Sequence, residues 1–421
     1  MCGIKEWDWQ IGKKCVADLT EIKSRYERVD ELSVSGDGEK VAAPVKIEDG
    51  SYTACINELA WPENYELLWY LRFSPAGYPI ALARSDDEWT LIVDGKPWDN
   101  RFEYAWNPKF SADGRSVAVL YKQDDEFGVA IDDRPWPRGF VSIRDYALSS
   151  DGRRSAATVQ IGRLKEADVR GFFEGVWSVA VDGEVWDNKF INAWNPAFSA
   201  DGRSVAAEVR TDICEYSVAV DADCWMQKFG CVWSPLFRPG TRKVVAPVRD
   251  SGTWSLTEDG EPLWERRYNM LWRQTFSPDG RRLAAVVSPS FGRWTIAVDD
   301  TPWDVTFGDM VVEPVFSPDS QHVAAIVKEA NNWTIAVDGC TWEPTFPMIW
   351  DPVFSPDSSN VLAKAESHGR YCIVANGRIL SMAFDQAWDP VFNEEGSRVL
   401  LRYVADDKYY RQVVSTSDLL R

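Results

Sequence analysis

The sequence predicts an all-β protein, a β-propeller built from about ten four-stranded blades. Two observations predict it: a turn motif that recurs at a nearly constant interval, and tryptophans that recur in register with that turn. The turn reads Phe-Ser-Pro-Asp-Gly at 276–280, with close variants at 73–75, 110–114, 198–202, 316–319 and 354–357 and weaker copies at Ser35, Ser149, Arg238 and Asn393. The step between copies is about 39 residues, a period typical of repeat architectures, in which each unit packs against its neighbours.

One repeat, residues 272–307, shows the four strands expected of each blade. Residues 272–276 alternate between apolar and polar side chains and end at the turn, and residues 282–287 are apolar enough to be covered on both faces. A third strand follows at 294–298. It ends in Asp-Asp, or in Val-Asp-Gly in other copies, which is a strong hairpin signal. Residues 302–307 then form the fourth strand.

The order of the strands within a blade follows from proline. Trp-x-Pro-x-Phe recurs at 106–110, 194–198, 350–354 and 388–392, with Trp-Ser-Pro-Leu-Phe at 233–237. Proline donates no backbone hydrogen bond and is tolerated on edge strands. Because the innermost strand of a blade has one edge toward the channel, we expect these segments to line the axis. Two middle strands and an outer strand, which begins with another tryptophan, complete the blade.

The chain starts and stops in mid-blade, which predicts how the ring closes. Residues 15–18 align with the third strand at 91–94 and Tyr26 aligns with Phe102, so the N-terminus is expected to supply a third and an outer strand. Residues 388–392, 398–403 and 409–414 supply an inner pair and a third strand. We therefore expect an N-terminal segment at 1–11 and a propeller over 12–421, closed by 12–30 against 385–417. Two smaller propellers are the alternative, because ~4–8 blades are usual.

Composition restricts the classes of function. The 421 residues carry a net charge of −19, from 65 acidic and 46 basic residues. Such a surface repels phosphate backbones and anionic headgroups, which argues against nucleic-acid binding and direct membrane insertion or adsorption. The charged N-terminus lacks a signal-peptide pattern and no window approaches the ~20 apolar residues of a membrane span, so we expect a cytoplasmic protein.

Signals for catalysis and cofactors are weak. The eight cysteines form no C-x-x-C pair, the histidines number two, and the motifs of common hydrolases, nucleotide-binding folds and metalloproteases are missing. Acidic runs at 86–88 and 124–126 lie in loops and lack the spacing of a calcium loop. We therefore expect a chain that is not an enzyme and carries no haem, flavin, iron–sulfur cluster or metal.

The 22 tryptophans fall largely into three registers. Those that open third strands or lie in outer strands are expected to be wedges between blades, since burying an indole stabilises a fold by up to ~4–6 kcal/mol. A third register begins the inner strands, at the mouth of the channel. These residues either pack or form a ring of aromatics that meets a partner. They are Trp69, Trp106, Trp194, Trp233, Trp272, Trp350 and Trp388.

The fourth repeat contains the one large departure from the period. Trp177 follows the anchor Ser149 by 28 residues, more than in other repeats, and the extra segment spans residues 161–174. We interpret the segment as a locally basic loop on an acidic protein and as a partner-binding element, because aromatic and arginine side chains dominate interface hot spots. The alternative is that its two phenylalanines fold back onto the blade. The residues concerned are Arg163, Lys165, Arg170, Phe172 and Phe173.

The repeat Phe-Ser-Pro-Asp-Gly-Arg-Arg-Leu-Ala, followed by Trp-Thr-Ile-Ala-Val-Asp, resembles TolB-type and WD-like (WD40-like) propeller repeats. More narrowly, the acidic, tryptophan-rich chain resembles the TmcD family, the cytoplasmic subunits of the transmembrane redox complex Tmc of sulfate-reducing bacteria. That resemblance implies a scaffold without a cofactor of its own, in an electron-transport complex with a multihaem cytochrome c, an iron–sulfur subunit and a membrane cytochrome b. The alternatives are a propeller enzyme or a ligand sensor that acts at the channel mouth.

Overall fold

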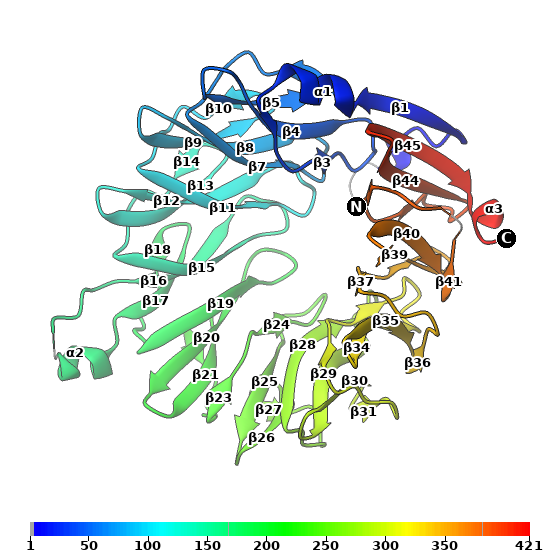
Figure 1. Ribbon diagram of the computed structural model, residues 1–421. Helices are drawn as coiled ribbons and strands as arrows, with labels where there is room; N and C mark the ends of the chain where they lie inside the picture. The colour runs from blue at the N-terminus through cyan, green and yellow to red at the C-terminus, as the bar shows by residue number, and fades with distance from the viewer. Residues whose placement is uncertain (1–3, 167, 381) are drawn as a thin grey trace.

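The computed structural model describes residues 4–166, 168–380 and 382–421, and it shows ten four-stranded antiparallel blades in one ring around a central channel (Figure 1). The predicted all-β propeller is confirmed, and the alternative of two smaller propellers is wrong. We number the blades 1 to 10 in chain order. Blade 1 follows the helix at Leu19–Arg25, and blade 10 is completed by a strand from the N-terminus.

The first two strands of each blade form its channel side. The inner strands are continuous in five blades: β7 (Leu67–Phe73), β11 (Tyr104–Phe110), β15 (Ser142–Leu148), β19 (Asn192–Phe198) and β28 (Met270–Phe276). In the other five they are split: β2 (Arg28–Val29) and β3 (Ser33–Val34), β23 (Cys231–Val232) and β24 (Leu236–Phe237), β32 (Met310–Val311) and β33 (Val315–Phe316), β37 (Met348–Ile349) and β38 (Val353–Phe354), β42 (Gln386–Ala387) and β43 (Val391–Phe392). The second strands are β4 (Val41–Lys46), β8 (Pro79–Ser85), β12 (Val117–Gln123), β16 (Ser155–Gln160), β20 (Val205–Asp212), β25 (Val244–Asp250), β29 (Leu283–Ser290), β34 (Val323–Glu329), β39 (Val361–Ser367) and β44 (Arg398–Ala405).

The last two strands form the outer side. The third strands are β5 (Tyr52–Ile56), β9 (Glu88–Val93), β13 (Glu126–Ile131), β17 (Trp177–Val181), β21 (Glu215–Val220), β26 (Thr253–Glu258), β30 (Arg293–Val298), β35 (Asn332–Val337), β40 (Arg370–Ala375) and β45 (Lys408–Ser415). The outer strands are β6 (Leu59–Ala60), β10 (Lys96–Pro97), β14 (Arg134–Pro135), β18 (Glu184–Val185), β22 (Asp223–Cys224), β27 (Glu261–Pro262), β31 (Thr301–Pro302), β36 (Cys340–Thr341), β41 (Arg378–Ile379) and β1 (Gly12–Asp18). The described helices are η1 (Ile4–Glu6), α1 (Leu19–Arg25), α2 (Val169–Glu174) and α3 (Thr416–Leu419).

The repeated turn between first and second strands is held by its serine and aspartate. In blade 7, the Ser277 hydroxyl donates to Oδ1 of Asp279 over 2.6 Å and accepts the backbone N–H of Arg282 over 2.9 Å. Gly280 adopts a positive φ of 70° and donates its N–H to the Ser277 carbonyl. Glycine tolerates this left-handed backbone without strain, which explains the Asp-Gly ending of the motif.

The hairpin between third and outer strands is held by a second aspartate. Asp299 turns the chain at a φ of 49°, and its Oδ1 accepts the N–H of Leu283 over 2.9 Å, at the start of the second strand. Asn57 and Asn376 take this position in two other blades and accept an equivalent N–H through Oδ1. The Val-Asp-Gly signature therefore closes a hairpin and also caps the neighbouring strand.

The inner strands carry the Trp-x-Pro-x-Phe segments and a bulge. In β11 the register shifts between Trp106 and Lys109, Asn107 takes a φ of 52°, and Pro108 is buried. A bulge lets the strand accommodate a proline that cannot donate to the ladder. The inner strands border the channel, as the proline pattern predicts (Figure 1).

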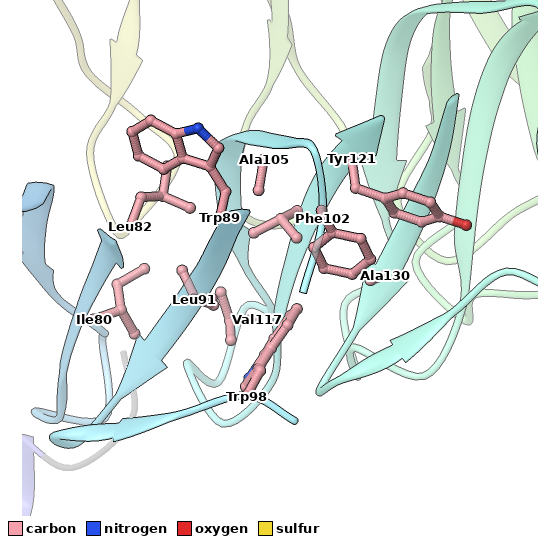
Figure 2. Close-up of a cluster of buried hydrophobic side chains, with 11 residues drawn as sticks. Ile80, Leu82, Trp89, Leu91, Trp98, Phe102, Ala105, Val117, Tyr121 and Ala130 are labelled. Carbon is pink, nitrogen blue, oxygen red and sulfur yellow. The ribbon is translucent and has the colours of Figure 1, made fainter. Parts of the chain in front are cut away.

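Aromatic side chains fill the junctions between blades. Figure 2 shows the junction of blades 2 and 3, where Trp89 and Trp98 of one blade pack with Phe102 and Tyr121 beside the next. The Phe102 and Tyr121 rings stack with centroids 4.5 Å apart. Each aromatic removes a large apolar area from water, so these wedges stabilise the contact of one blade with its neighbour.

One strand of the closing blade differs from the sequence prediction. β1 pairs with β45, so the N-terminus supplies the outermost strand of blade 10, while its third strand comes from the C-terminus. The prediction that residues 15–18 form a third strand is wrong. The alignment counted back over a constant spacing, but α1 lies between β1 and Tyr26 and shifts the register. β1 thus completes the hydrogen bonding of a blade that the C-terminus leaves one strand short.

Arginines of blade 10 fasten the closing junction to the first turn of blade 1. The Arg402 guanidinium donates to the Ser35 carbonyl over 3.0 Å, and Nε of Arg411 donates to the Asp37 carbonyl over 2.8 Å. Arg411 also lies 2.9 Å from a carboxylate oxygen of Glu39. Charged donors form the stronger hydrogen bonds of proteins, so these contacts join the two ends of the chain.

Candidate functional site

The two faces of the ring carry different loops. We call the face that bears the loops between second and third strands, and the crossovers into the next inner strand, the loop face. The opposite face bears the Ser-Pro-Asp-Gly turns and is called the turn face. Large apolar side chains that remain exposed are concentrated on the loop face and its channel rim: Trp69, Tyr70, Tyr104, Leu164, Val169, Phe172, Phe173, Ile213, Phe291, Met310 and Met348.

Fewer such side chains lie elsewhere. Among the residues that the structure describes, four exposed large apolar residues lie away from the loop face. Ile11 precedes β1, Leu59 and Ile379 lie in outer strands, and Met226 follows the outer strand β22. Patches of exposed apolar surface mark interaction sites more often than scattered single residues do. The loop face is therefore the candidate interaction surface.

The inserted segment of blade 4 forms the short helix α2, which projects outside the ring beyond β16 and β17 (Figure 1). Asp168 caps it by accepting the N–H of Gly171 over 2.8 Å. None of its residues is buried, and Phe172 and Phe173 are 37% and 46% exposed. Their rings meet edge to face at 5.7 Å. The two phenylalanines therefore retain substantial exposed surface instead of being fully packed beneath the loop.

The insertion is neutral, and the expectation of a locally basic loop is wrong. Besides Arg163, Lys165 and Arg170 it contains Glu166, Asp168 and Glu174. Arg170 pairs with Glu174 at 2.7 Å, one helical turn along, and Asp168 serves as the cap. Arg163 and Lys165 are exposed. The apolar side chains thus distinguish this segment more than its charge does.

The tryptophans of the inner register lie apart from α2. All seven contact the aromatic residue near the start of the third strand of their own blade, with rings that are stacked, tilted or edge to face. The pairs are Trp69–Trp89, Trp106–Phe127, Trp194–Tyr216, Trp233–Trp254, Trp272–Trp294, Trp350–Tyr371 and Trp388–Tyr409. Trp69 is 43% exposed and the others in this register are half-buried. The structure thus distributes them around the channel on the inner strands, while α2 lies outside the ring (Figure 1).

A groove of about 620 Å³ lies in the channel wall across blades 5 to 8. Trp233 and Trp272 form its aromatic part, and their stacked rings have centroids 5.6 Å apart. Arg273 and Glu313 lie at its edge, with 3.7 Å between guanidinium and carboxylate. Arg273 holds a left-handed φ of 54° because it lies at the bulge of β28, as Asn107 does at the bulge of β11.

A polar cluster that sequence reasoning missed lies beside this groove, at the junction of blades 4 and 5. Arg144 replaces the tryptophan of the inner register, and its guanidinium lies 4.3 Å from the Trp177 ring centroid and 5.1 Å from that of Trp194. Glu208 lies nearby on β20, 8% exposed, and burial raises its pKa to about 7. The available signal was Arg-Asp at 144–145, where other repeats carry tryptophan.

Neither histidine belongs to a catalytic arrangement in the described residues. Nδ1 of His322 lies 2.7 Å from the hairpin residue Asp338, where Arg282 meets Asp299 in blade 7. Nδ1 of His368 lies 2.9 Å from the hydroxyl of its neighbour Ser367, in an exposed turn. The contact of His322 with Asp338 takes the place of the Arg282–Asp299 ion pair of blade 7. The contact of His368 is with its sequence neighbour, and no second side chain of the described residues is hydrogen-bonded to its ring.

Comparisons with known proteins add the following. No protein-family model and no curated protein matches the chain. Similar solved structures include a crystal structure of the eukaryotic initiation factor, at 13% identity, a TM-score of 0.48, and 78% of this chain and 90% of that one covered. Dihydro-heme d1 dehydrogenase NirN in complex with DHE is similar at 16% identity, a TM-score of 0.37 and coverage of 83% and 73%.

The Cps50 (Swd1) β-propeller domain of Myceliophteria thermophila is similar at 11% identity and a TM-score of 0.30, with 66% of this chain and all of that domain covered (100%). Such low similarity says nothing of function, so the WD40-like propeller assignment rests on the blades themselves. Over the described ranges, no helix is long and apolar enough to cross a membrane. The same residues contain no group of three or more His, Cys, Asp or Glu side chains that is arranged to hold a metal ion.

Proposed function

We propose that this chain is a non-catalytic scaffold that binds a partner protein through its loop face. The observation that supports the proposal most is the concentration of exposed apolar side chains on that face, including those of helix α2, in which no residue is buried. Phe172 and Phe173 are the suggested anchors, because aromatic side chains supply much of the energy at protein interfaces. The tryptophans of the inner register, of which Trp69 is the most exposed, form a second contact zone around the channel.

The finer proposal is that the scaffold is an accessory subunit of a membrane-associated electron-transfer complex. It rests on the resemblance of the acidic, tryptophan-rich repeats to the cytoplasmic TmcD subunits. In that setting the partners are an iron–sulfur subunit and a membrane cytochrome b, the chain is cytoplasmic, and it reaches the inner membrane through its partners. The chain itself carries no cofactor and binds no nucleic acid.

The test is co-purification from the native host. A tagged chain is recovered from membranes after gentle solubilisation, and the eluate is examined by visible spectroscopy and mass spectrometry. The proposal expects stoichiometric recovery of haem-containing and iron–sulfur subunits. Recovery of the chain alone, or with partners that bear no redox group, contradicts the electron-transfer role.

A second candidate is a ligand sensor, which the channel groove favours. Trp233, Trp272, Arg273 and Glu313 combine aromatic surface with polar groups in a concave site, as small-molecule sites do. A variant with Arg273→Ala and Glu313→Ala alters the groove and keeps the tryptophans of the second contact zone, so it separates the two candidates. A scaffold that uses α2 keeps its partner in this variant, whereas a sensor loses its ligand.

A further inference from the structure

The junction between blades 10 and 1 differs from the other junctions at one position, the end of the outer strand of blade 10. In blades 1 to 9 of the described structure, an aromatic residue there makes reciprocal backbone hydrogen bonds with the aromatic that opens the third strand, as Phe102 does with Trp89. In blade 10 the third-strand aromatic is Tyr409, and the residue opposite it is Ala17. Ala17 therefore stands at the position where the other blades have a phenylalanine or tyrosine, and the buried side chains of Leu19 and Ile22 from α1 pack in this junction.

A cavity of about 310 Å³ opens on the loop face of this junction, next to α1, and neither Ala17 nor Tyr409 lines it. α1 contributes Leu19 and Ile22 to its lining, blade 1 contributes Val29 and Leu32, and blade 10 contributes Val404. We call this cavity the seam pocket. Its volume lies at the lower end of the ~300–1,000 Å³ range of ligand-sized pockets, which suits one large side chain. The apolar lining favours an aromatic or aliphatic occupant.

The rim of the seam pocket is acidic. Asp30, Glu31, Asp385 and Asp407 lie around it, and the lining contains a single cation, Lys23. Each carboxylate also has an exposed or half-exposed cationic neighbour, in the pairs Lys23–Asp407 at 2.7 Å, Arg28–Asp30 at 2.6 Å, Arg72–Glu31 at 3.1 Å and Arg370–Asp385 at 3.2 Å. Surface ion pairs contribute little to stability, so these partners exchange readily with cations from another molecule.

We propose that the seam pocket binds an aromatic side chain from a basic segment of a partner protein. The aromatic ring enters the apolar part of the pocket, between Leu19 and Ile22 of α1 and the side chains of Val29 and Val404, and flanking lysines or arginines contact the acidic rim. The net charge of −19 steers such a segment toward the chain. This inference rests on the proposed scaffold function, because it names the kind of partner that the loop face receives.

Methyl NMR spectroscopy of the full chain tests the proposal. The labelled protein is titrated with acetyl-Lys-Phe-Lys-amide, and the methyl signals of Ile22, Val29, Leu32 and Val404 are followed. The proposal predicts saturable shifts of these signals. Acetyl-Lys-Ala-Lys-amide, which lacks the ring, and acetyl-Glu-Phe-Glu-amide, which reverses the charge, should cause much smaller shifts. An absence of shifts with the first peptide, or equal shifts with the third, overturns the proposal.

Two variants locate the binding. Val29→Phe fills the pocket from within, so the melting temperature should hold or rise while the dissociation constant of the first peptide rises about tenfold. Glu31→Gln with Asp407→Asn alters exposed side chains only, and it should weaken the same peptide while leaving the fold intact. A folded Val29→Phe variant that binds the first peptide as tightly as the wild type contradicts the proposal. If Val29→Phe does not fold, the carboxylate variant decides, and unchanged binding by it contradicts the proposal.

The outcomes also separate this inference from the scaffold function. A chain that recovers its partners from membranes but ignores the first peptide retains the scaffold function and loses the seam pocket. A chain that binds the peptide in the pocket but recovers no partner retains the seam pocket and loses the scaffold function.

Discussion

Asn195 donates a hydrogen bond from its side-chain Nδ2 to Oε2 of Glu208 over 3.1 Å, and so joins the inner and second strands of blade 5 at the channel wall. Asn195 also lines the channel groove. The pKa of Glu208 is raised to about 7, chiefly by burial and also by the nearby Asp145 carboxylate, while the Asn195 hydrogen bond and Arg144 act in the opposite direction. A carboxyl group that titrates near neutrality makes this junction sensitive to pH.

We predict that the Glu208 carboxyl lowers stability as the pH rises from about 4.5 to about 7. Its pKa is raised in the folded state, so in this window the folded chain holds a proton that the unfolded chain releases. The contribution is present below the unfolded pKa and is lost as pH passes the folded one, by up to about 3 kcal/mol. Glu208→Gln should match the wild type at pH 4.5 and be the more stable protein at pH 8, measured by urea denaturation. Equal stabilities at pH 8 contradict this prediction.

The hairpin caps give a second prediction. Oδ1 of Asp132 accepts the N–H of Val117 over 2.9 Å, and the residue has a positive φ of 45°. Asp132→Ala should lower the free energy of unfolding by about 1–2 kcal/mol, since it leaves the N–H unpaired and strains a left-handed backbone. Asp132→Asn is the matched control and should cost little, because Asn57 and Asn376 hold this position in other blades. Equal losses in both variants contradict the cap.

Ring closure gives a third prediction. Deletion of residues 1–30 removes β1, α1 and β2, so β45 loses its outer partner and blade 1 loses part of its inner strand. Because every blade packs between two neighbours, we expect the whole ring to melt at a lower temperature instead of fraying at one end. The control is Lys5→Ala, which removes only an exposed ion pair with Glu394 at 3.1 Å. A truncated chain that melts as the full-length chain does contradicts the conclusion that β1 closes the ring.

The cofactor expectation gives a fourth prediction. The purified chain should show no visible absorption band and less than stoichiometric metal by elemental analysis. The basis is the set of cysteines without C-x-x-C spacing and the two histidines, each of which has a local polar contact. A haem or flavin spectrum, or about one metal ion per chain, refutes it.

The sequence predicted the architecture well because the architecture is local and repeated. Ser277 and Asp279 determine a turn within a few residues, and Phe102 and Trp89 determine a wedge, so one well-read repeat describes most of the ring. The closing blade was harder to predict. Ala17 pairs with Tyr409 across almost the whole chain, and α1 breaks the spacing on which the alignment depended.

The candidate site was predicted only in part. The insertion was visible as a broken period, but its neutrality follows from counting Glu166, Asp168 and Glu174 against its three basic residues. The separation of α2 from the inner tryptophans depends on the direction in which the loop leaves the ring. Glu208 lies in an apolar second strand, and its link to Asn195 and Arg144 appears only when blades 4 and 5 pack together.

The central claim is that a partner protein binds the loop face through α2, and one measurement tests it most directly. The double variant Phe172→Ala/Phe173→Ala should melt as the wild type does, because neither ring is buried, and it should recover at most about a tenth of the partner, as expected when two hot-spot aromatics are lost. Leu59→Ala/Ile379→Ala is the matched control: it removes two exposed apolar side chains away from the loop face and should recover the partner at full yield. Full recovery by the well-folded phenylalanine variant contradicts the account.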